Sequence, residues 1–164
     1  TQQSAFARIV ILAVTGESAA TLQLTRLRIS KPCDIIASRG EIFVVDDDPG
    51  LQSMFKLFLK KKGFSRLVVG TGKEAVAAMQ KQKFDLCFLD LQLPDFTGDE
   101  VYAQAKEIQP DLPFVIITGF PDSQMLDNIL KHGPVTVLKK PLEVEKLEQT
   151  LRMLGHKGQA TKAA

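Results

Sequence analysis

Five short apolar segments alternate with segments of helical periodicity along residues 41–154. The apolar segments are 42–45, 66–70, 84–89, 114–118 and 135–139. Short apolar runs that are separated by helices predict parallel strands buried on both faces. Because crossover connections are right-handed, we expect an α/β fold with a doubly wound parallel sheet and helices on both faces. We take 2-1-3-4-5, a common order of such five-stranded sheets, as the expected order.

Apolar side chains at helical spacing predict the elements between the strands. In the first of them, Met54, Phe55, Phe58 and Leu59 share one face, and Gly63 ends the helix. The expected helices are 51–63, 72–82, 98–110, 122–133 and 143–154.

The two ends of the chain do not follow this repeat. Residues 1–40 carry five Lys or Arg against two acids, and the first methionine is Met54, inside a predicted helix. We interpret 1–40 as a linker or the remnant of a preceding region, 41–154 as one domain, and 155–164 as a flexible basic tail.

Composition excludes several classes of protein. Two cysteines, Cys33 and Cys87, are too few for a disulfide framework, so we expect a reducing, cytoplasmic setting, with Cys87 as a buried thiol. The apolar run Ile9–Val14 is far shorter than the ~20 residues of a membrane helix. A net charge of +2 gives no reason to expect a membrane or a nucleic acid as a direct partner.

Carboxylates follow two strands that the predicted sheet order places side by side. The first strand ends on Asp46, Asp47 and Asp48, and the third ends on Asp90. Ligands of open α/β sheets bind beyond the carboxyl ends of such strands. Converging acids repel each other, and oxygen ligands without His or Cys favour Mg²⁺ (or Mn²⁺) as the compensating cation.

The fourth and fifth strands end on groups that suit a phosphoryl ligand. Thr118 supplies a hydroxyl, and Gly119 supplies a backbone N–H that a ligand can approach closely. Lys139 and Lys140 precede Pro141 and supply a compact positive charge. All these groups lie at one edge of the predicted sheet.

Four motifs in this order resemble the receiver domain of two-component response regulators, the chemotaxis-regulator-like superfamily with a flavodoxin-like fold. They are "VVDDDP", "DLCFLDLQLPDFTG", "FVIITG" and "VLKKPL", and the resemblance spans roughly residues 41–154. It implies that Asp90 is the phosphoacceptor, a carboxylate nucleophile that forms an acyl phosphate. It also implies that Asp47 ligates the metal directly, Asp46 partly through water, and Gln92 through its backbone carbonyl.

The resemblance implies further roles on the other two strands. Thr118 would bond one phosphoryl oxygen and Lys140 another, and the Lys140–Pro141 bond would be cis. Two positions depart from the family: Val137 stands where a switch aromatic is frequent, and Phe120 stands where some members carry a polar group that orients water. We hypothesise that Phe120 shields the acyl phosphate and prolongs its lifetime.

The function that follows is that of a phosphorylation switch and not of a metabolic enzyme. The switch domain is expected to promote its own phosphotransfer and dephosphorylation. The expected donor is a histidine kinase or a histidine phosphotransfer protein, and the output is an unidentified protein target. A homodimer through the helix 122–133, the strand 135–139 and the helix 143–154 is one expected assembly. The chain is either a stand-alone receiver or the C-terminal receiver of a hybrid sensor kinase.

Two rivals fit less well. An aspartate-nucleophile phosphatase wants a second Asp where this chain has Gln92, and an FMN carrier needs a hydroxyl-rich loop where this chain has "DDDPG". Other polar residues have ordinary explanations. Asp48 suits a helix cap, Asp95 and Asp99 suit a turn and a helix start, and Tyr102 suits half-buried packing.

Overall fold

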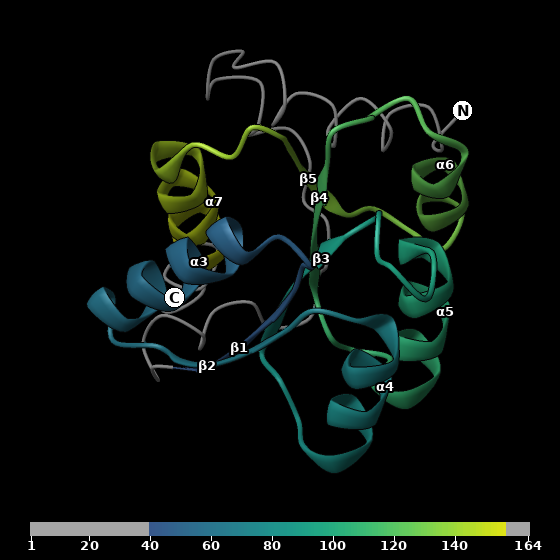
Figure 1. Cartoon of the computed structure of the whole chain (residues 1–164), viewed down its shortest axis with the longest axis horizontal. Helices are drawn as coiled ribbons and strands as arrows, with labels where there is room; N and C mark the ends of the chain where they lie inside the picture. The colour runs from purple at the N-terminus through teal and green to yellow at the C-terminus, as the bar shows by residue number, and fades with distance from the viewer. Residues whose placement is uncertain (1–39, 157–164) are drawn as a thin grey trace, which may run out of the picture.

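The computed structural model describes residues 40–156 (Figure 1). Residues 1–39 and 157–164 lie outside the described part, so the linker or remnant at 1–40 and the tail at 155–164 remain predictions. Cys33 also lies outside the described residues.

The described residues form one parallel sheet of five strands in the order β2-β1-β3-β4-β5. This order confirms the expected topology. The strands are β1 (Glu41–Val45), β2 (Ser65–Val69), β3 (Leu86–Asp90), β4 (Phe114–Thr118) and β5 (Thr136–Lys139). In the register of the sheet, Val45 lies beside Leu89, Asp90 beside Ile117, and Thr118 beside Lys139. The polar residues that follow or end the strands therefore come together at one edge.

Helices cover both faces of the sheet, as Figure 1 shows. One face carries α3 (Pro49–Lys61) and α7 (Val144–His156), and the other carries α4 (Gly72–Lys81), α5 (Gly98–Ile108) and α6 (Gln124–Leu130). Alternate residues of a strand feed opposite faces. Phe43 and Val45 belong to the apolar cluster under α4, α5 and α6, whereas Ile42 and Val44 belong to the cluster under α3 and α7.

The central strand β3 is buried along its whole length, including Asp90 at its end. Cys87 in this strand is fully buried, and burial raises the pKa of its thiol, as expected for a structural cysteine. A carboxylate can end such a strand only where other groups balance its charge.

The structure corrects several sequence expectations, among them the helix expected at 122–133, which spans only Gln124–Leu130 because Ser123 caps its start. The third strand begins at Leu86 and not at Phe84, because the Phe84 amide donates to the Gln109 side-chain oxygen (3.2 Å) and not to a strand. The Phe84 ring still packs in the core, stacked on Phe43 with ring centroids 4.2 Å apart. Tyr102 is only 3% exposed, not half-buried, because its ring packs against Phe114.

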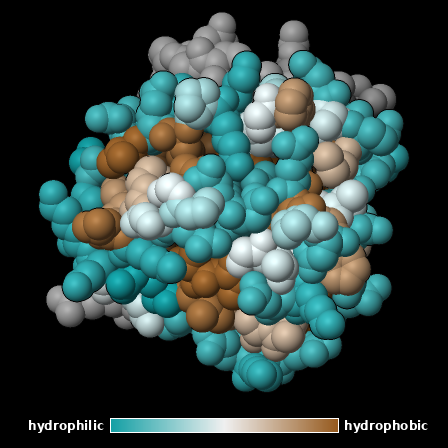
Figure 2. Space-filling model, viewed as in Figure 1, coloured by the Kyte–Doolittle hydropathy of each residue, from teal (hydrophilic) through white to brown (hydrophobic). Residues whose placement is uncertain are grey.

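The surface seen in Figure 2 is mainly hydrophilic, with separate hydrophobic patches. Within the described part of the chain, the large hydrophobic side chains with the greatest exposure are Leu57 (70%) on α3 and Phe120 (61%) in the connection between β4 and α6. Within residues 40–156, no helix combines the length and the apolar character that crossing a membrane requires.

Candidate functional site

Three carboxylates converge beyond the ends of β1 and β3. One oxygen from each of Asp46, Asp47 and Asp90 lies within 4.8 Å of the others. Asp46 and Asp90 are buried, whereas Asp47 is exposed. The sequence places Asp46 at 44 residues and Asp47 at 43 residues from Asp90, and the pairing of β1 with β3 brings the three together.

Lys140 supplies the positive charge of the site. Its Nζ donates a hydrogen bond of 2.6 Å to Asp90 Oδ2 and lies 3.1 Å from Asp46 Oδ2. The Lys140 amide donates to the Thr118 carbonyl (2.8 Å), and the Lys140–Pro141 bond is cis, as the resemblance implied. Lys139 is exposed at the end of β5, so Lys140 is the lysine that contacts the acids.

Burial and neighbouring charges set the protonation of these groups. Burial raises the pKa of Asp46, and the Asp90 charge adds to this rise, although the Asp48 amide and Lys140 oppose it. Burial alone would lower the pKa of Lys140, but Asp90 and Asp46 outweigh it and raise that pKa. The ammonium therefore stays charged and partly neutralises the two buried acids.

Backbone and side-chain contacts hold Asp46 in place. Its Oδ1 accepts a hydrogen bond from the Asp48 amide (2.8 Å), and its carbonyl accepts one from Gln52 Nε2 (2.7 Å). Asp48 itself caps α3, since its Oδ1 accepts from the Leu51 amide at 2.8 Å. This confirms the expected cap. No sequence motif singles out Gln52, whose contact depends on the first turn of α3 packing against the end of β1.

The residues after Asp90 form a closed loop. The Gln92 amide donates to Asp90 Oδ1 (3.1 Å), and Gln92 pairs with Thr97 across the loop as an isolated bridge. The Gly98 amide donates to the Leu91 carbonyl at the base of the loop (2.9 Å). Gln92 is thus held beside the phosphoacceptor candidate.

Thr118 is buried at the end of β4, beside Lys139 in the register. Its Oγ1 accepts a hydrogen bond of 2.9 Å from the Phe120 amide. Gly119 between them is exposed, and a Cβ added there would meet nothing within 4 Å. Open space at Gly119 leaves its backbone accessible to a ligand.

Val137, the residue at the family's aromatic position, lies inside the core. It is 1% exposed and belongs to the apolar cluster that includes Leu126 and Ile129 of α6. Val137 carries no ring and is already buried, so it cannot make the inward turn that the family's aromatic side chain makes.

The donor set suits a hard divalent cation. Asp46 Oδ2 is buried, and among residues 40–156 its one ion-pair partner is the Lys140 ammonium at 3.1 Å, whereas Asp47 and Asp90 bring like charges close to it. One ammonium does not offset three converging carboxylates, so a further cation would lower the cost of crowding and burying them. Three carboxylates with no imidazole or thiolate among them match the preference of Mg²⁺ for oxygen.

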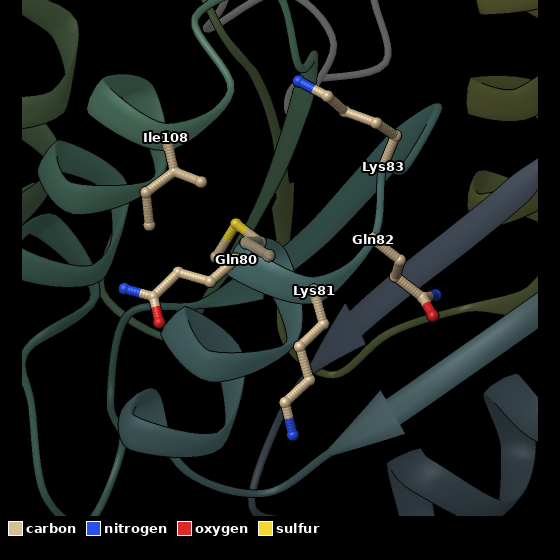
Figure 3. Close-up of a pocket in the computed structure, with 6 residues that line it drawn as sticks. Gln80, Lys81, Gln82, Lys83 and Ile108 are labelled. Atoms are coloured by element: carbon tan, nitrogen blue, oxygen red, sulfur yellow. The ribbon is translucent and has the colours of Figure 1, made fainter.

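A separate hollow of about 310 Å³ lies at the opposite ends of the elements, where α4 and α5 finish. Figure 3 shows that the Lys81 and Lys83 side chains extend from it in opposite directions. Charges that do not converge form no site for an anion, and the carboxylate cluster remains the candidate functional site.

The family model that describes the response regulator receiver domain matches residues 42–152. The chain belongs to this receiver family. The match includes the three acids, Thr118 and Lys140, and the receiver is a module of two-component signalling that accepts a phosphoryl group.

A curated relative of this receiver is the regulatory protein LuxO of Vibrio cholerae. The two are 32% identical over 108 residues, which cover 66% of this chain and 24% of LuxO. The transcriptional regulatory protein GlrR of Escherichia coli is 28% identical over 112 residues, with 68% of this chain and 25% of GlrR covered. The chain thus spans about a quarter of the length of these relatives.

Solved receiver structures share the fold. The beryllofluoride-activated NtrC4 receiver domain dimer superposes with a TM-score of 0.64 at 26% identity, covering 72% of this chain and 98% of that one. The receiver domain of the sensor histidine kinase PA1611 from Pseudomonas aeruginosa, solved with magnesium in its active-site cleft, gives a TM-score of 0.63 at 24% identity, covering 71% and 98%. The five-stranded, doubly wound receiver fold is common to all three.

Proposed function

We propose that this receiver is the phosphoacceptor of a two-component phosphorelay and that Asp90 carries the phosphoryl group. The observation that carries the proposal is the meeting of three carboxylates and one ammonium at a single edge of the sheet. A histidine kinase or a histidine phosphotransfer protein is the donor, and the relay operates in the cytoplasm. The direct test is labelling of Asp90 by acetyl phosphate, with Asp90→Ala as the comparison.

The transfer is an in-line displacement at phosphorus. A carboxylate oxygen of Asp90 forms a bond to phosphorus as the phosphorus–nitrogen bond of the donor phosphohistidine breaks, and the imidazole leaves with that electron pair. Lys140, now on Asp90 Oδ2 at 2.6 Å, would hold the negative oxygens of the transferred group. Thr118 would donate a hydrogen bond from its hydroxyl to one of these oxygens, because the hydroxyl oxygen at present only accepts one, from the Phe120 amide.

Mg²⁺ fits the residues present, with Asp46, Asp47, Asp90 and the Gln92 carbonyl as proposed ligands. When bound, the ion would offset the charge of the carboxylates and of the phosphoryl oxygens during transfer. Support comes from the crowding of the three acids and from the burial of Asp46 and Asp90, which share the single Lys140 ammonium. The protein holds these oxygens in place through α3 and the loop 91–97.

Phosphorylation would shift a surface between two states. Thr118 sits at the start of the connection to α6, and Lys140 follows β5, so a new charge at Asp90 bears on α6, β5 and α7. This α6–β5–α7 face is the proposed contact for a protein target or for a second copy of the chain. The dimeric state of the activated NtrC4 receiver supports the second. Both a stand-alone receiver and the receiver of a hybrid sensor kinase fit the proposal.

Mg²⁺ is expected to stabilise the folded receiver. At a concentration about 100 times its Kd, a ligand that binds only the folded state adds about 2.7 kcal/mol to the free energy of unfolding. Asp47→Asn removes one charged ligand and should abolish most of this gain. The measurement is the unfolding temperature of each variant with and without Mg²⁺.

Asp48→Asn is the matched control, because it makes the same change one residue along and an asparagine can still cap α3. It should keep the stabilisation by Mg²⁺. Equal gains in the Asp47 and Asp48 variants would contradict the proposed ligand set.

Phe120→Glu is expected to speed hydrolysis of the acyl phosphate by about tenfold or more, since a carboxylate near the site can accept a proton from the attacking water. Phe120 follows Thr118 by two residues and is 61% exposed, so the substitution removes no core contact. The measurement is the decay of phosphorylated protein after the donor is removed.

Leu57→Glu on α3 is the control, because it also replaces an exposed apolar side chain by an acid. Its decay rate should equal that of the unmodified protein. An unchanged rate in Phe120→Glu would rule out the proposed shielding of the acyl phosphate.

A further inference from the structure

The Asp95 carboxylate connects the loop that follows Asp90 to a different helix. Its Oδ1 accepts a hydrogen bond from the Gly72 amide (2.7 Å), and its Oδ2 accepts one from the Lys73 amide (2.8 Å). Both amides belong to the first turn of α4, 23 and 22 residues away in the sequence. Oδ1 also accepts from the Phe96 amide of its own loop (3.0 Å).

These bonds complete the start of α4. The first amides of a helix have no partner within the helix. Asp95 accepts hydrogen bonds from the amides of Gly72 and Lys73. The side chain of Thr71, the local cap, accepts a hydrogen bond of 3.2 Å from the Glu74 amide. The helix therefore begins with two caps, one from its own chain segment and one from the loop 91–97.

The loop and α4 are also in direct packing contact. A Cβ added at Gly72 would lie 2.7 Å from Cδ2 and 2.8 Å from Cβ of Phe96, and 2.8 Å from Cγ2 of Val101. Only glycine leaves room for the helix to start this close to the loop. The amide of the same glycine donates to Asp95 Oδ1 at 2.7 Å, so one residue makes both the close contact and the hydrogen bond.

The base of the loop is closed next to Asp90, by the Gly98 amide on the Leu91 carbonyl and by the pairing of Gln92 with Thr97. Asp95 holds the opposite end of the loop. The backbone of Gln92 thus lies between a closed base and an anchored tip, and its amide already donates to Asp90 Oδ1.

We propose that Asp95 is a positioning residue of the phosphoryl site, which holds the loop 91–97 against α4 so that the Gln92 carbonyl stays beside Asp90. This inference rests on the proposed function and assigns a role to a residue whose sequence suggests only a turn. The carboxylate suits the task, because its charge interacts favourably with the positive end of α4. Partial desolvation raises the pKa of Asp95, but the amides of Lys73, Gly72 and Phe96 outweigh it and keep that pKa below its ordinary value.

The test compares Asp95→Ala with Thr71→Ala. Both remove one cap from α4, but only the first releases the loop. In the metal-free protein, we expect the amides of Gln92 and Gly98 to exchange hydrogen about tenfold faster in Asp95→Ala than in Thr71→Ala. Mg²⁺ should bind Asp95→Ala about tenfold more weakly, the usual size of an effect transmitted to a metal ligand by a residue behind it.

Asp95→Asn keeps one acceptor oxygen and should lie between the two in both measurements. It also covers the case in which Asp95→Ala fails to fold. Equal exchange and equal Mg²⁺ affinity in the Asp95 and Thr71 variants would overturn the proposal. The exchange comparison needs no metal and no phosphoryl donor, so it tests the anchoring of the loop even if the unmodified protein accepted no phosphoryl group.

Discussion

Asp90→Ala is expected to reduce phosphorylation by acetyl phosphate to background, even with Mg²⁺ present. The substitution removes the nucleophile, and the other two carboxylates of the described cluster, Asp46 and Asp47, are the proposed metal ligands. The unmodified protein should gain the mass of one phosphoryl group. Intact mass measurement of both proteins, followed by location of the modified residue, gives the result.

Asp111→Ala is the matched control, because Asp111 is an exposed carboxylate between α5 and β4, at the other end of the sheet. This variant should be labelled like the unmodified protein. Labelling that persists in Asp90→Ala, or that is lost equally in Asp111→Ala, would contradict the assignment of Asp90. Circular dichroism of each variant checks that the fold is retained.

Gly98→Ala is expected to lower the free energy of unfolding by about 3 kcal/mol, the upper end of the usual cost of overpacking. A Cβ at Gly98 would lie 2.4 Å from the Leu91 Cα and 2.8 Å from the Asp90 carbonyl oxygen. Both atoms belong to the backbone, which cannot turn aside as the end of a side chain can. The unfolding temperature should fall by about 10 °C.

Gly119→Ala makes the same chemical change in open space, since nothing lies within 4 Å of the added Cβ. Its unfolding temperature should change little. Because Gly98 adjoins the carbonyl of Asp90, the Gly98 variant should also accept phosphoryl groups more slowly, as the loop must move to admit the methyl group. Equal stability of the two variants would show that the loop 91–97 is more adaptable than its contacts indicate.

The periodicity of the chain was sufficient to predict a parallel sheet between helices, because strands buried on both faces and amphipathic helices are each encoded over a few residues; the strand order was taken from the common doubly wound arrangement. The ends of the individual strands and helices were predicted less accurately. Phe84 is as apolar as the strand that follows it, but its amide bonds to the Gln109 side chain. Since Gln109 lies 25 residues away, no local pattern could indicate where the strand begins.

The site was predictable for a topological reason. Asp46, Asp47, Asp90, Thr118 and Lys140 all follow or end strands, and parallel strands deliver their carboxyl ends to one edge. The order of the strands was then enough to place them together. Val137 is different: its departure from the family's pattern was visible in the sequence, but its burial against α6 emerged only from the packing.

The sequence alone determined the alternating fold and the set of charged groups at the strand ends, because both depend on residue type and on spacing over a few positions. Only the tertiary structure decided which groups touch: that Lys140 reaches Asp90 across 50 residues, that Gln52 holds Asp46, and that Asp95 holds α4. The physical reason is range. A hydrogen bond requires atoms within about 3 Å, and for residues distant in sequence that distance is set by the packing of the elements that carry them.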